Sequence, residues 1–315
     1  MKKLFKTISG SIVAPKGFLA GGVFCDIKRL GTGKGSNKGQ KRDLALIVSE
    51  VPATVAGMFT TNQVCAAPVK VCVERVKKGI AQAIVVNSGN ANACTGKQGL
   101  KDAREMTAVV AAVYDRRKLK IRVPPADRRY KISAEHVLVG STGRIGVTLP
   151  MENVKRGILE AAKLLGNSSL HAAHAVEAIM TSDTRPKQIA VEFKLGGKTV
   201  RIGGICKGAG MIQPGMSATG VRPAALHATM LCFITTDVVI EPKTLQAALE
   251  VAVARSFNRI TVDGDMSTND TVLVLANGLA GNRKFGVRSS EFGIFQAALG
   301  PVCLELAKMI VRDGE

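Results

Sequence analysis

One segment of the chain combines a lysine in a glycine-rich run with a threonine at the start of an apolar stretch. Lys207 opens the run KGAG (207–210), and Ala228 and Thr229 come directly before the apolar residues 230–235. A hydroxyl at the mouth of a buried strand can act as a nucleophile when a base takes its proton. If the chain is cut before Thr229, the freed α-amine, with an ordinary pKa of about 8, can be that base. The same pattern is also typical of a glycine-rich turn that leads into a core strand.

Two other apolar runs end in small polar residues. The run 81–86 passes into NSGNANACTG (87–96), where Gly and Asn tolerate positive φ and indicate a tight, specifically shaped loop. The run 136–140 passes into STGRIG (141–146). A glycine at the end of a strand lets backbone N–H groups point into a cleft, which is the geometry that an oxyanion hole requires. From the residues alone, the segment 141–146 is just a turn, and the alternative for 87–96 is an ordinary strand-to-helix turn.

Together these motifs resemble the ornithine acetyltransferase family, also called glutamate N-acetyltransferase. In that family a KG-small-GM-x-x-P run precedes an ATML motif, whose Thr becomes the N-terminal nucleophile after self-cleavage. The matching pieces here are KGAGM (207–211), Pro214 and ATML (228–231), and NSGNANACTG (87–96) is nearly identical to a family segment. The resemblance extends from about residue 21 to residue 315, which makes it far more specific than a single motif.

The resemblance implies roles for individual residues. Cleavage would fall between Ala228 and Thr229, and Thr229 would be the catalytic nucleophile. Thr142 and Gly143 match the pair that stabilises the negative charge of the tetrahedral intermediate. The stretch TSDTRPK (181–187) matches the family's substrate-contacting turn TTDT-x-PK. The substrate-binding residues that the resemblance implies are Thr184, Lys207, Thr229 and Glu315.

The activity implied by the resemblance is transfer of the acetyl group from N2-acetyl-L-ornithine to L-glutamate in arginine biosynthesis, through an acetyl-enzyme on threonine. Some relatives also use acetyl-CoA as a substrate, and the resemblance implies no cofactor and no metal. It further implies a heterotetramer of two α and two β chains. A related class, the N-terminal-nucleophile amidohydrolases, would instead release the acyl group to water, and we keep it as an alternative.

Two departures from the family pattern lead to a second alternative, a self-cleaving but inactive homologue. In the family the Met that corresponds to Met216 abuts ATML, whereas here the eleven residues 217–227 intervene and create a second Ala-Thr pair, Ala218-Thr219. The family sequence also continues beyond RDGE (312–315) into a segment that supplies an Asn and a Ser or Thr to the substrate site. The sequence therefore predicts cleavage more firmly than turnover.

The chain has 315 residues, enough to bury a sizeable core. Apolar residues make up 46% and aromatic residues 4%, with no Trp, so the core must be aliphatic. We expect an α/β protein with mixed sheets layered against helices, as in N-terminal-nucleophile-like acetyltransferases. We expect a main domain over 1–284 and the start of a truncated C-terminal domain over 285–315. The patterns predict strands at 43–49, 81–86, 136–140, 187–194, 199–202, 230–235 and 260–262, and helices at 102–114, 152–165, 168–180, 242–257 and 285–312.

Lys and Arg exceed Asp and Glu by 20, which permits binding of nucleic acid or attraction of acidic metabolites. Eight basic residues lie in 116–131, which we interpret as a solvated surface loop, with nucleic-acid binding as a remote alternative. The seven Cys are scattered without a CxxC pair, which argues against disulfides or zinc and fits a reducing cytosol, so we expect a cytoplasmic location. No stretch reaches the roughly 20 apolar residues of a membrane span.

Two further patterns suggest metal binding less strongly than they suggest ordinary structure. His171, His174 and Glu177 follow one another at single-turn spacing along a predicted helix. Ligands spaced in this way seldom complete a metal site without help from elsewhere, so a structural or surface role is favoured. The acidic turn DGDMSTND (263–270) lacks the Glu that an EF-hand places at its twelfth position. We predict no metal site.

Overall fold

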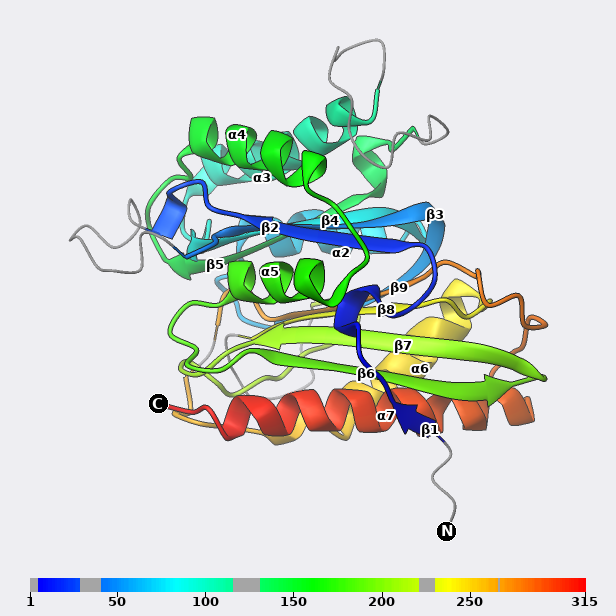
Figure 1. Ribbon diagram of the computed structural model, residues 1–315. Helices are drawn as coiled ribbons and strands as arrows, with labels where there is room; N and C mark the ends of the chain where they lie inside the picture. The colour runs from blue at the N-terminus through cyan, green and yellow to red at the C-terminus, as the bar shows by residue number, and fades with distance from the viewer. Residues whose placement is uncertain (1–4, 29–40, 116–130, 221–229, 266) are drawn as a thin grey trace.

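The computed structural model describes residues 5–28, 41–115, 131–220, 230–265 and 267–315. Nine strands in this part of the chain form one mixed sheet in the order β1-β6-β7-β8-β9-β3-β4-β5, with β2 paired to β3 (Figure 1). β4 pairs in parallel with β5, and β8 pairs in parallel with β9. The strands are β1 (Phe5–Thr7), β2 (Phe18–Val23), β3 (Leu44–Phe59), β4 (Ile80–Asn90), β5 (Val137–Arg144), β6 (Lys187–Leu195), β7 (Lys198–Lys207), β8 (Leu231–Thr236) and β9 (Thr271–Ala276).

The long strand β3 joins the two halves of the sheet. Its first part, residues 44–49, pairs with β2, and its second part, residues 54–59, pairs with β9. Between these parts, the register with β4 shifts between Val48 and Ala53. An irregularity of this kind bends a strand and increases its local twist. A single strand therefore belongs to both halves.

Helices cover the sheet in layers. Figure 1 shows α3 and α4 on one side of β2, α5 between β2 and β7, and α6 and α7 beyond β6 and β7. Two adjacent glycines allow the close approach of helices to both faces of β2. An added Cβ on Gly22 would lie 2.0 Å from the carbonyl oxygen of His174, and one on Gly21 would lie 3.3 Å from that of Leu164. The helices are α2 (Ala67–Val76), α3 (Gly96–Val113), α4 (Met151–Lys163), α5 (Ser169–Ile179), α6 (Pro242–Ala254) and α7 (Ser290–Val311).

Two hydrophobic clusters lie on opposite faces of β7, β8 and β9. In β8, Leu231 and Phe233 belong to the cluster beneath α5, while Cys232 and Ile234 belong to the cluster beneath α6 and α7. Successive side chains of a strand point to opposite faces, so a strand covered on both sides needs apolar residues at every position. This requirement explains the unbroken apolar run that leads away from position 230.

The predicted α/β class with layered sheets is confirmed, as are α4, α5, α6, β8 and the hairpin of β6 and β7. Other boundaries differ. The strand predicted at 43–49 continues to Phe59, and α3 begins at Gly96 rather than at 102. The strand predicted at 260–262 is wrong, because no strand forms there in the described chain, and β9 was not predicted. All seven cysteines are free, and only Cys94 is exposed.

Helix α7 corrects the expectation that no stretch is long and apolar enough for a membrane span. By length and composition alone, its 22 residues are long and apolar enough to cross a membrane. However, α7 packs against α6, β6 and β7, and it buries Phe295, Leu299 and Leu306 among others in the second hydrophobic cluster. This is the behaviour of a core helix. The domain boundary expected at 284/285 stays a prediction.

Candidate active site

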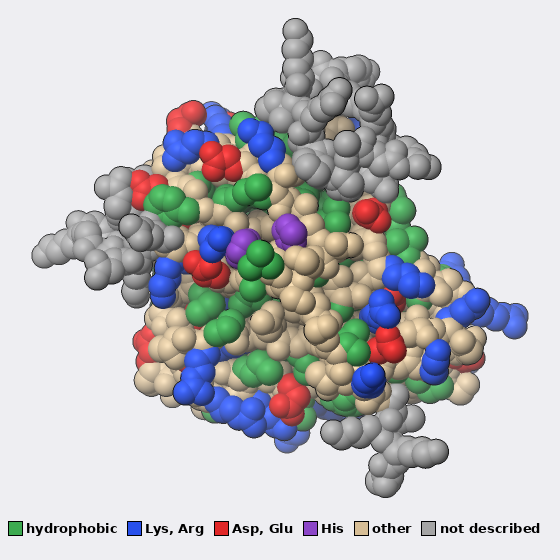
Figure 2. Space-filling model, viewed as in Figure 1, with side chains coloured by type: hydrophobic (Ala, Val, Ile, Leu, Met, Phe, Trp, Pro, Cys, Tyr) green, Lys and Arg blue, Asp and Glu red, His purple; other side chains and the backbone are tan. Residues whose placement is uncertain are grey.

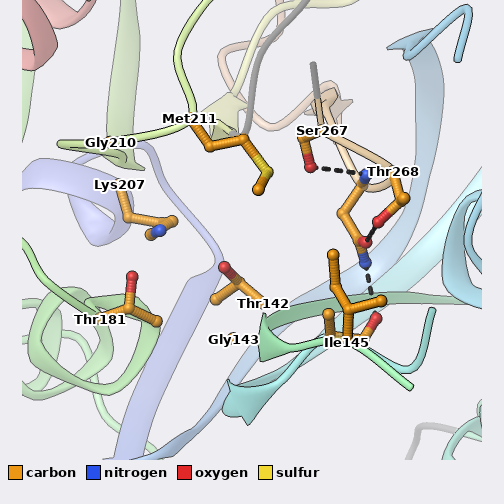
Figure 3. A pocket seen from close by; sticks show the side chains of 11 residues that line it. Thr142, Gly143, Ile145, Thr181, Lys207, Gly210, Met211, Ser267 and Thr268 are labelled. Atoms are coloured by element: carbon orange, nitrogen blue, oxygen red, sulfur yellow. Dashed lines mark hydrogen bonds between the residues drawn. The ribbon is translucent and has the colours of Figure 1, made fainter. Parts of the chain in front are cut away.

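A cavity of about 130 Å³ opens where several segments that are distant in sequence meet. The end of β5, the end of β7 and the segment before β9 form its walls, and Figure 3 shows their side chains around a common space. The lining residues are Ala91, Thr142, Gly143, Ile145, Thr181, Lys207, Gly210, Met211, Ser267, Thr268 and Asn269. Of the residues predicted for the site, Thr142, Gly143 and Lys207 therefore line one cavity.

The wall at Thr142 and Gly143 requires a glycine. β5 runs parallel to β4 here, with Gly143 opposite Gly89. Gly143 has φ +131°, a backbone conformation that L side chains rarely adopt, and an added Cβ would lie 2.3 Å from the carbonyl carbon of Gly89. Close strand pairing and unusual backbone geometry thus occur together at this position. Thr142 is buried beside it, at the edge of the cavity.

Asn269 connects two of the walls. Its side-chain Nδ2 donates to the carbonyl oxygens of Ala91 and Ser141, each over 2.8 Å. Its Oδ1 accepts a hydrogen bond from the hydroxyl of Thr268 over 2.5 Å. The amide therefore fixes the segment before β9 against β5 and against the residue that follows β4. We did not single out Asn269 from the sequence, where the acidic turn around it was the only signal.

Lys207 is a buried ammonium with little pairing of its own. Its Nζ lies 3.9 Å from Oδ2 of Asp183, and within the described chain this is its one ion pair. Burial lowers the pKa of Lys207; the negative charge of Asp183 opposes this effect, and the positive charge of Lys187 adds to it. A buried cation that faces a cavity with an incomplete set of partners can hold an anionic ligand group.

The predicted substrate-binding residues Thr184 and Glu315 lie beside the cavity but do not line it. Thr184 is exposed, and both its backbone N–H and its hydroxyl donate to the carboxylate of Asp313. Thr181, three residues earlier, lines the cavity instead. The backbone N–H of Glu315 donates to the carbonyl oxygen of Ala209 over 3.0 Å, and an added Cβ on Gly210 would lie 2.7 Å from Oε2 of Glu315.

Part of the acidic turn 263–270 supports the cavity wall at Met211. The carboxylate of Asp263 accepts the backbone N–H groups of Met211 and Ile212, and the N–H of Val262 donates to the carbonyl oxygen of Ile212 over 2.7 Å. Burial raises the pKa of Asp263, but these backbone donors outweigh it, and the net pKa is lowered. The carboxylate thus holds Met211 at its unusual φ of +59°.

The predicted cleavage site, Ala228 and Thr229, lies outside the described residues. The described chain resumes at Met230, whose backbone N–H donates to Oδ1 of Asp270 over 2.5 Å. The next residue, Leu231, pairs with Lys207 on one side and with Thr271 on the other. The chain therefore enters β8 directly beside the cavity wall that carries Lys207.

The second Ala-Thr pair lies apart from this wall. Ser217 exchanges two backbone hydrogen bonds with Phe59, at the end of β3, over 2.8 and 3.0 Å. Ala218 packs partly against the second hydrophobic cluster, and Thr219 is exposed. Neither residue lines the cavity.

The row of His171, His174 and Glu177 is engaged in other contacts. Glu177 forms an ion pair with Arg42 over 2.7 Å, and Nδ1 of His171 lies 2.6 Å from the hydroxyl of Ser168. Within the described residues no group of three or more His, Cys, Asp or Glu side chains is arranged to hold a metal ion. Most of the basic run 116–131 lies outside the described residues. On the face drawn in Figure 2, Lys and Arg side chains form separate groups, interspersed with acidic and apolar ones.

The fold is one that N-terminal-nucleophile enzymes use. The L-aminopeptidase D-Ala-esterase/amidase of Ochrobactrum anthropi, described as a variant of the Ntn hydrolase fold, matches with a TM-score of 0.51 over 99% of this chain and 89% of that one. At 10% identity this match shows the fold alone. Ornithine acetyltransferase from Mycobacterium tuberculosis, solved in complex with ornithine, matches with a TM-score of 0.56 and 34% identity. That match covers 68% of this chain and 100% of that one.

Sequence comparison identifies the family. Residues 29–315 match the ArgJ family model. The chain is 47% identical over 308 residues to the arginine biosynthesis bifunctional protein ArgJ of Symbiobacterium thermophilum, which covers 98% of this chain and 68% of that protein. It is 47% identical over 314 residues to the glutamate N-acetyltransferase of Methanocaldococcus jannaschii, covering 98% and 66%. The chain belongs to the ArgJ family, and it spans about two thirds of the length of these relatives.

Proposed function

We propose that this chain transfers an acetyl group from N2-acetyl-L-ornithine to L-glutamate through an acetyl-enzyme on Thr229. The observation that carries the proposal is the cavity in which Thr142, Gly143 and Lys207 meet, beside the point where the chain enters β8. The names of its relatives, an arginine biosynthesis protein and a glutamate N-acetyltransferase, support this assignment.

The first step of the proposed mechanism is self-cleavage. The hydroxyl of Thr229 attacks the carbonyl carbon of Ala228, and the peptide C–N bond breaks to leave an ester and a free α-amine. Water then hydrolyses the ester and releases the carboxyl group of Ala228. The products are chains 1–228 and 229–315, and the second begins with a threonine whose own amine can act as its base.

The second step is acetyl transfer to the enzyme. The α-amine of Thr229 takes the hydroxyl proton as the oxygen attacks the acetyl carbonyl, and the tetrahedral intermediate carries its negative charge beside Thr142 and Gly143. Donors placed in advance where such a charge develops lower the barrier, and one donor contributes roughly 3–4 kcal/mol. Collapse of the intermediate expels the α-amine of ornithine, which leaves with the proton. The amine of glutamate then attacks the carbonyl carbon of the ester, and its proton passes through the α-amine of Thr229 to the threonine oxygen as the ester C–O bond breaks. N-acetylglutamate leaves, and the hydroxyl of Thr229 is restored.

Lys207 suits both substrates of this reaction. N2-acetylornithine and glutamate each carry an α-carboxylate, and Lys207 presents a buried positive charge to the cavity; among the described residues its one ion pair is with Asp183. Thr181 adds a hydroxyl to the same cavity. We further propose that acetyl-CoA serves as a second donor, that the cleaved chains assemble as two α and two β chains, and that the protein is cytoplasmic. The free cysteines support the last point.

Mass spectrometry of the purified protein under denaturing conditions tests this proposal. We expect two chains that meet at 228/229, one added acetyl group on the second chain after incubation with N2-acetylornithine, and its loss with formation of N-acetylglutamate when glutamate is added. Thr229→Ala should give one intact chain and no acetylation. A single intact mass for the natural chain after prolonged incubation would overturn the nucleophile, and a cut at 218/219 would relocate it. Acetate as the only product would indicate an amidohydrolase.

A further inference from the structure

Four buried charges surround the turn that leads into β6. Lys187 forms ion pairs with Oδ1 of Asp183 over 2.7 Å and with Oδ2 of Asp313, and Lys207 completes the group. The four side chains are between 0% and 3% exposed. Two ammonium groups and two carboxylates thus balance one another out of contact with water. Burial of such groups is costly unless each is paired and hydrogen-bonded, so the arrangement is tightly constrained.

Within this group of four, the carboxylate of Asp183 contacts the segments that carry the cavity residues Thr181 and Lys207. Its Oδ1 accepts the backbone N–H of Gly208, the neighbour of Lys207, over 2.6 Å. Its Oδ2 accepts the backbone N–H of Thr181 over 3.0 Å and lies 3.9 Å from Nζ of Lys207. One carboxylate therefore fixes the main chain at both Thr181 and Lys207, which line the cavity from different elements, and also provides the nearby negative charge for the ammonium.

Among the charged groups around Lys207, Asp183 has the largest effect on the pKa of Lys207, and it acts against the effect of burial. Burial favours the neutral amine, and Asp183 is the strongest of the groups that favour the ammonium. Asp270, before β9, and Glu315, after α7, act in the same direction, whereas Lys187 on β6 opposes them. Burial raises the pKa of Asp183 itself, but Lys207, Lys187 and the N–H of Gly208 outweigh it and lower the net pKa.

We propose that Asp183 is the positioning residue for Lys207: it holds the ammonium in the cavity and keeps it charged for the substrate carboxylate. This proposal rests on the proposed function for the role of Lys207 toward substrate. The contacts that define the positioning do not depend on that role.

Competitive labelling of lysines with trace acetic anhydride, read by peptide mass spectrometry across pH, tests the proposal without requiring activity. Asp183→Asn keeps the size of the side chain and removes its charge. The pH midpoint for labelling of Lys207 should fall by about one pH unit or more, since an opposite charge at this range shifts a pKa by about 1–3. Lys187→Met removes a like charge instead and should raise the midpoint. Having two variants with opposite expected directions keeps the test valid if one of them fails to fold.

The matched control is Asp237→Asn. Asp237 is also a fully buried aspartate whose carboxylate accepts two backbone N–H groups, those of Arg201 and Lys16, but it lies at the far end of β8 from the cavity. Its loss should weaken the fold and leave the Lys207 midpoint unchanged. An unchanged midpoint in Asp183→Asn, a fall or no change in Lys187→Met, or an equal shift in Asp237→Asn would each overturn the proposal.

Steady-state kinetics link the positioning to the reaction. In Asp183→Asn the KM for glutamate should rise about tenfold or more near neutral pH, with a smaller change in kcat, and the loss should grow as pH rises, because the remaining ammonium loses its proton earlier. Equal KM values for this variant and the natural protein would contradict the positioning. A natural chain that transfers no acetyl group would overturn the proposed function and leave the labelling result standing.

Discussion

Oδ1 of Asp270 accepts a hydrogen bond from the backbone N–H of Met230 over 2.5 Å, and both residues are fully buried. This contact joins the residue before β9 to the residue before β8, and the two strands then run parallel from Leu231 and Thr271. Met230 directly follows the predicted nucleophile in the sequence. The carboxylate therefore fixes the main chain next to the proposed cleavage site.

Asp270→Ala should slow self-cleavage and weaken the fold. Removal of the acceptor leaves a buried N–H without its partner, which costs about 1–3 kcal/mol in the free energy of unfolding. Urea unfolding measures the stability, and the ratio of intact to cleaved chain over time measures the processing. Asp270→Asn keeps an acceptor oxygen, so its stability and its cleavage rate should lie between those of the natural chain and those of Asp270→Ala. Natural cleavage kinetics in Asp270→Ala would show that this anchor does not set the local geometry.

Gly143→Ala should damage the site far more than Gly146→Ala. Both glycines have positive φ, +131° and +81°, but an added Cβ at 143 would meet the backbone of Gly89 at 2.3 Å, whereas nothing lies within 4 Å of one at 146. At 146 we expect a loss of about 1 kcal/mol from backbone strain alone. At 143 the strands must also separate, so we expect a larger loss together with loss of acetylation. Calorimetry compares the stability of the two variants, and the acetylation assay compares their activity. Equal losses in Gly143→Ala and Gly146→Ala would contradict the predicted clash at 143.

Asp313 should give the fold a stability that disappears in acid. Burial raises its pKa, but the hydrogen bond from Lys187, the hydroxyl of Thr184 and the charge of Lys187 lower it from 3.8 to about 2. A carboxyl whose pKa is lower in the folded state stabilises above its unfolded pKa, and that contribution is lost as pH falls through the folded pKa. The full contribution, about 2 kcal/mol from this shift, is thus present above pH about 5 and declines toward pH 2.

Asp313→Asn isolates this contribution. The difference in free energy of unfolding between the natural chain and the variant, measured in urea at several pH values, should be constant near neutral pH and narrow below pH about 4. A difference that stays constant down to pH 3 would mean that the carboxylate contributes through hydrogen bonding alone and that its pKa is not lowered.

The sequence predicted the elements whose local signals are strong. The hairpin of β6 and β7 turns at Gly196 and Gly197, which have φ values of +53° and +77° that glycine adopts without strain. β9 shows the opposite case. Its residues alternate between two clusters, with Leu273 and Leu275 in one and Val272 and Val274 in the other, so the run 272–276 is apolar at every position and shows no period. A short apolar run of this kind cannot be identified by periodicity.

The strand predicted at 260–262 was wrong for a related reason. Its β-branched residues favour a strand, but the N–H of Val262 donates to the carbonyl oxygen of Ile212 in a loop, and none of the described strands pairs with this segment. Propensity describes how well a residue fits a pleated surface, and the surface itself is set by distant parts of the chain.

The candidate site divides in the same way. Small polar residues after a strand marked 141–146 and the glycine-rich run marked 207–210, but the family resemblance singled out Thr142, Gly143 and Lys207 as site residues. All three line the cavity, while their roles stay predictions. The charged group around Asp183 could not be predicted, because its contacts join residues as far apart in sequence as Lys187 and Asp313. Thr181 and Thr184 differ by three positions, and only the fold decides which one faces the cavity.

The strand order β7-β8-β9-β3 has a consequence for the integrity of the processed molecule. β8 and β9 come after position 229 in the sequence, whereas β7 and β3, which flank them, come before position 228. Cleavage between these positions would leave β8 and β9 of the C-terminal fragment as neighbouring inner strands of the sheet. One edge of this pair is hydrogen-bonded to β7 and the other to β3, both from the N-terminal fragment. Helices α6 and α7, which belong to the same C-terminal fragment, would still pack against strands of the N-terminal fragment, α6 against β3 and α7 against β6 and β7. Dilution would not separate two such fragments; only a denaturant that melts the whole sheet would.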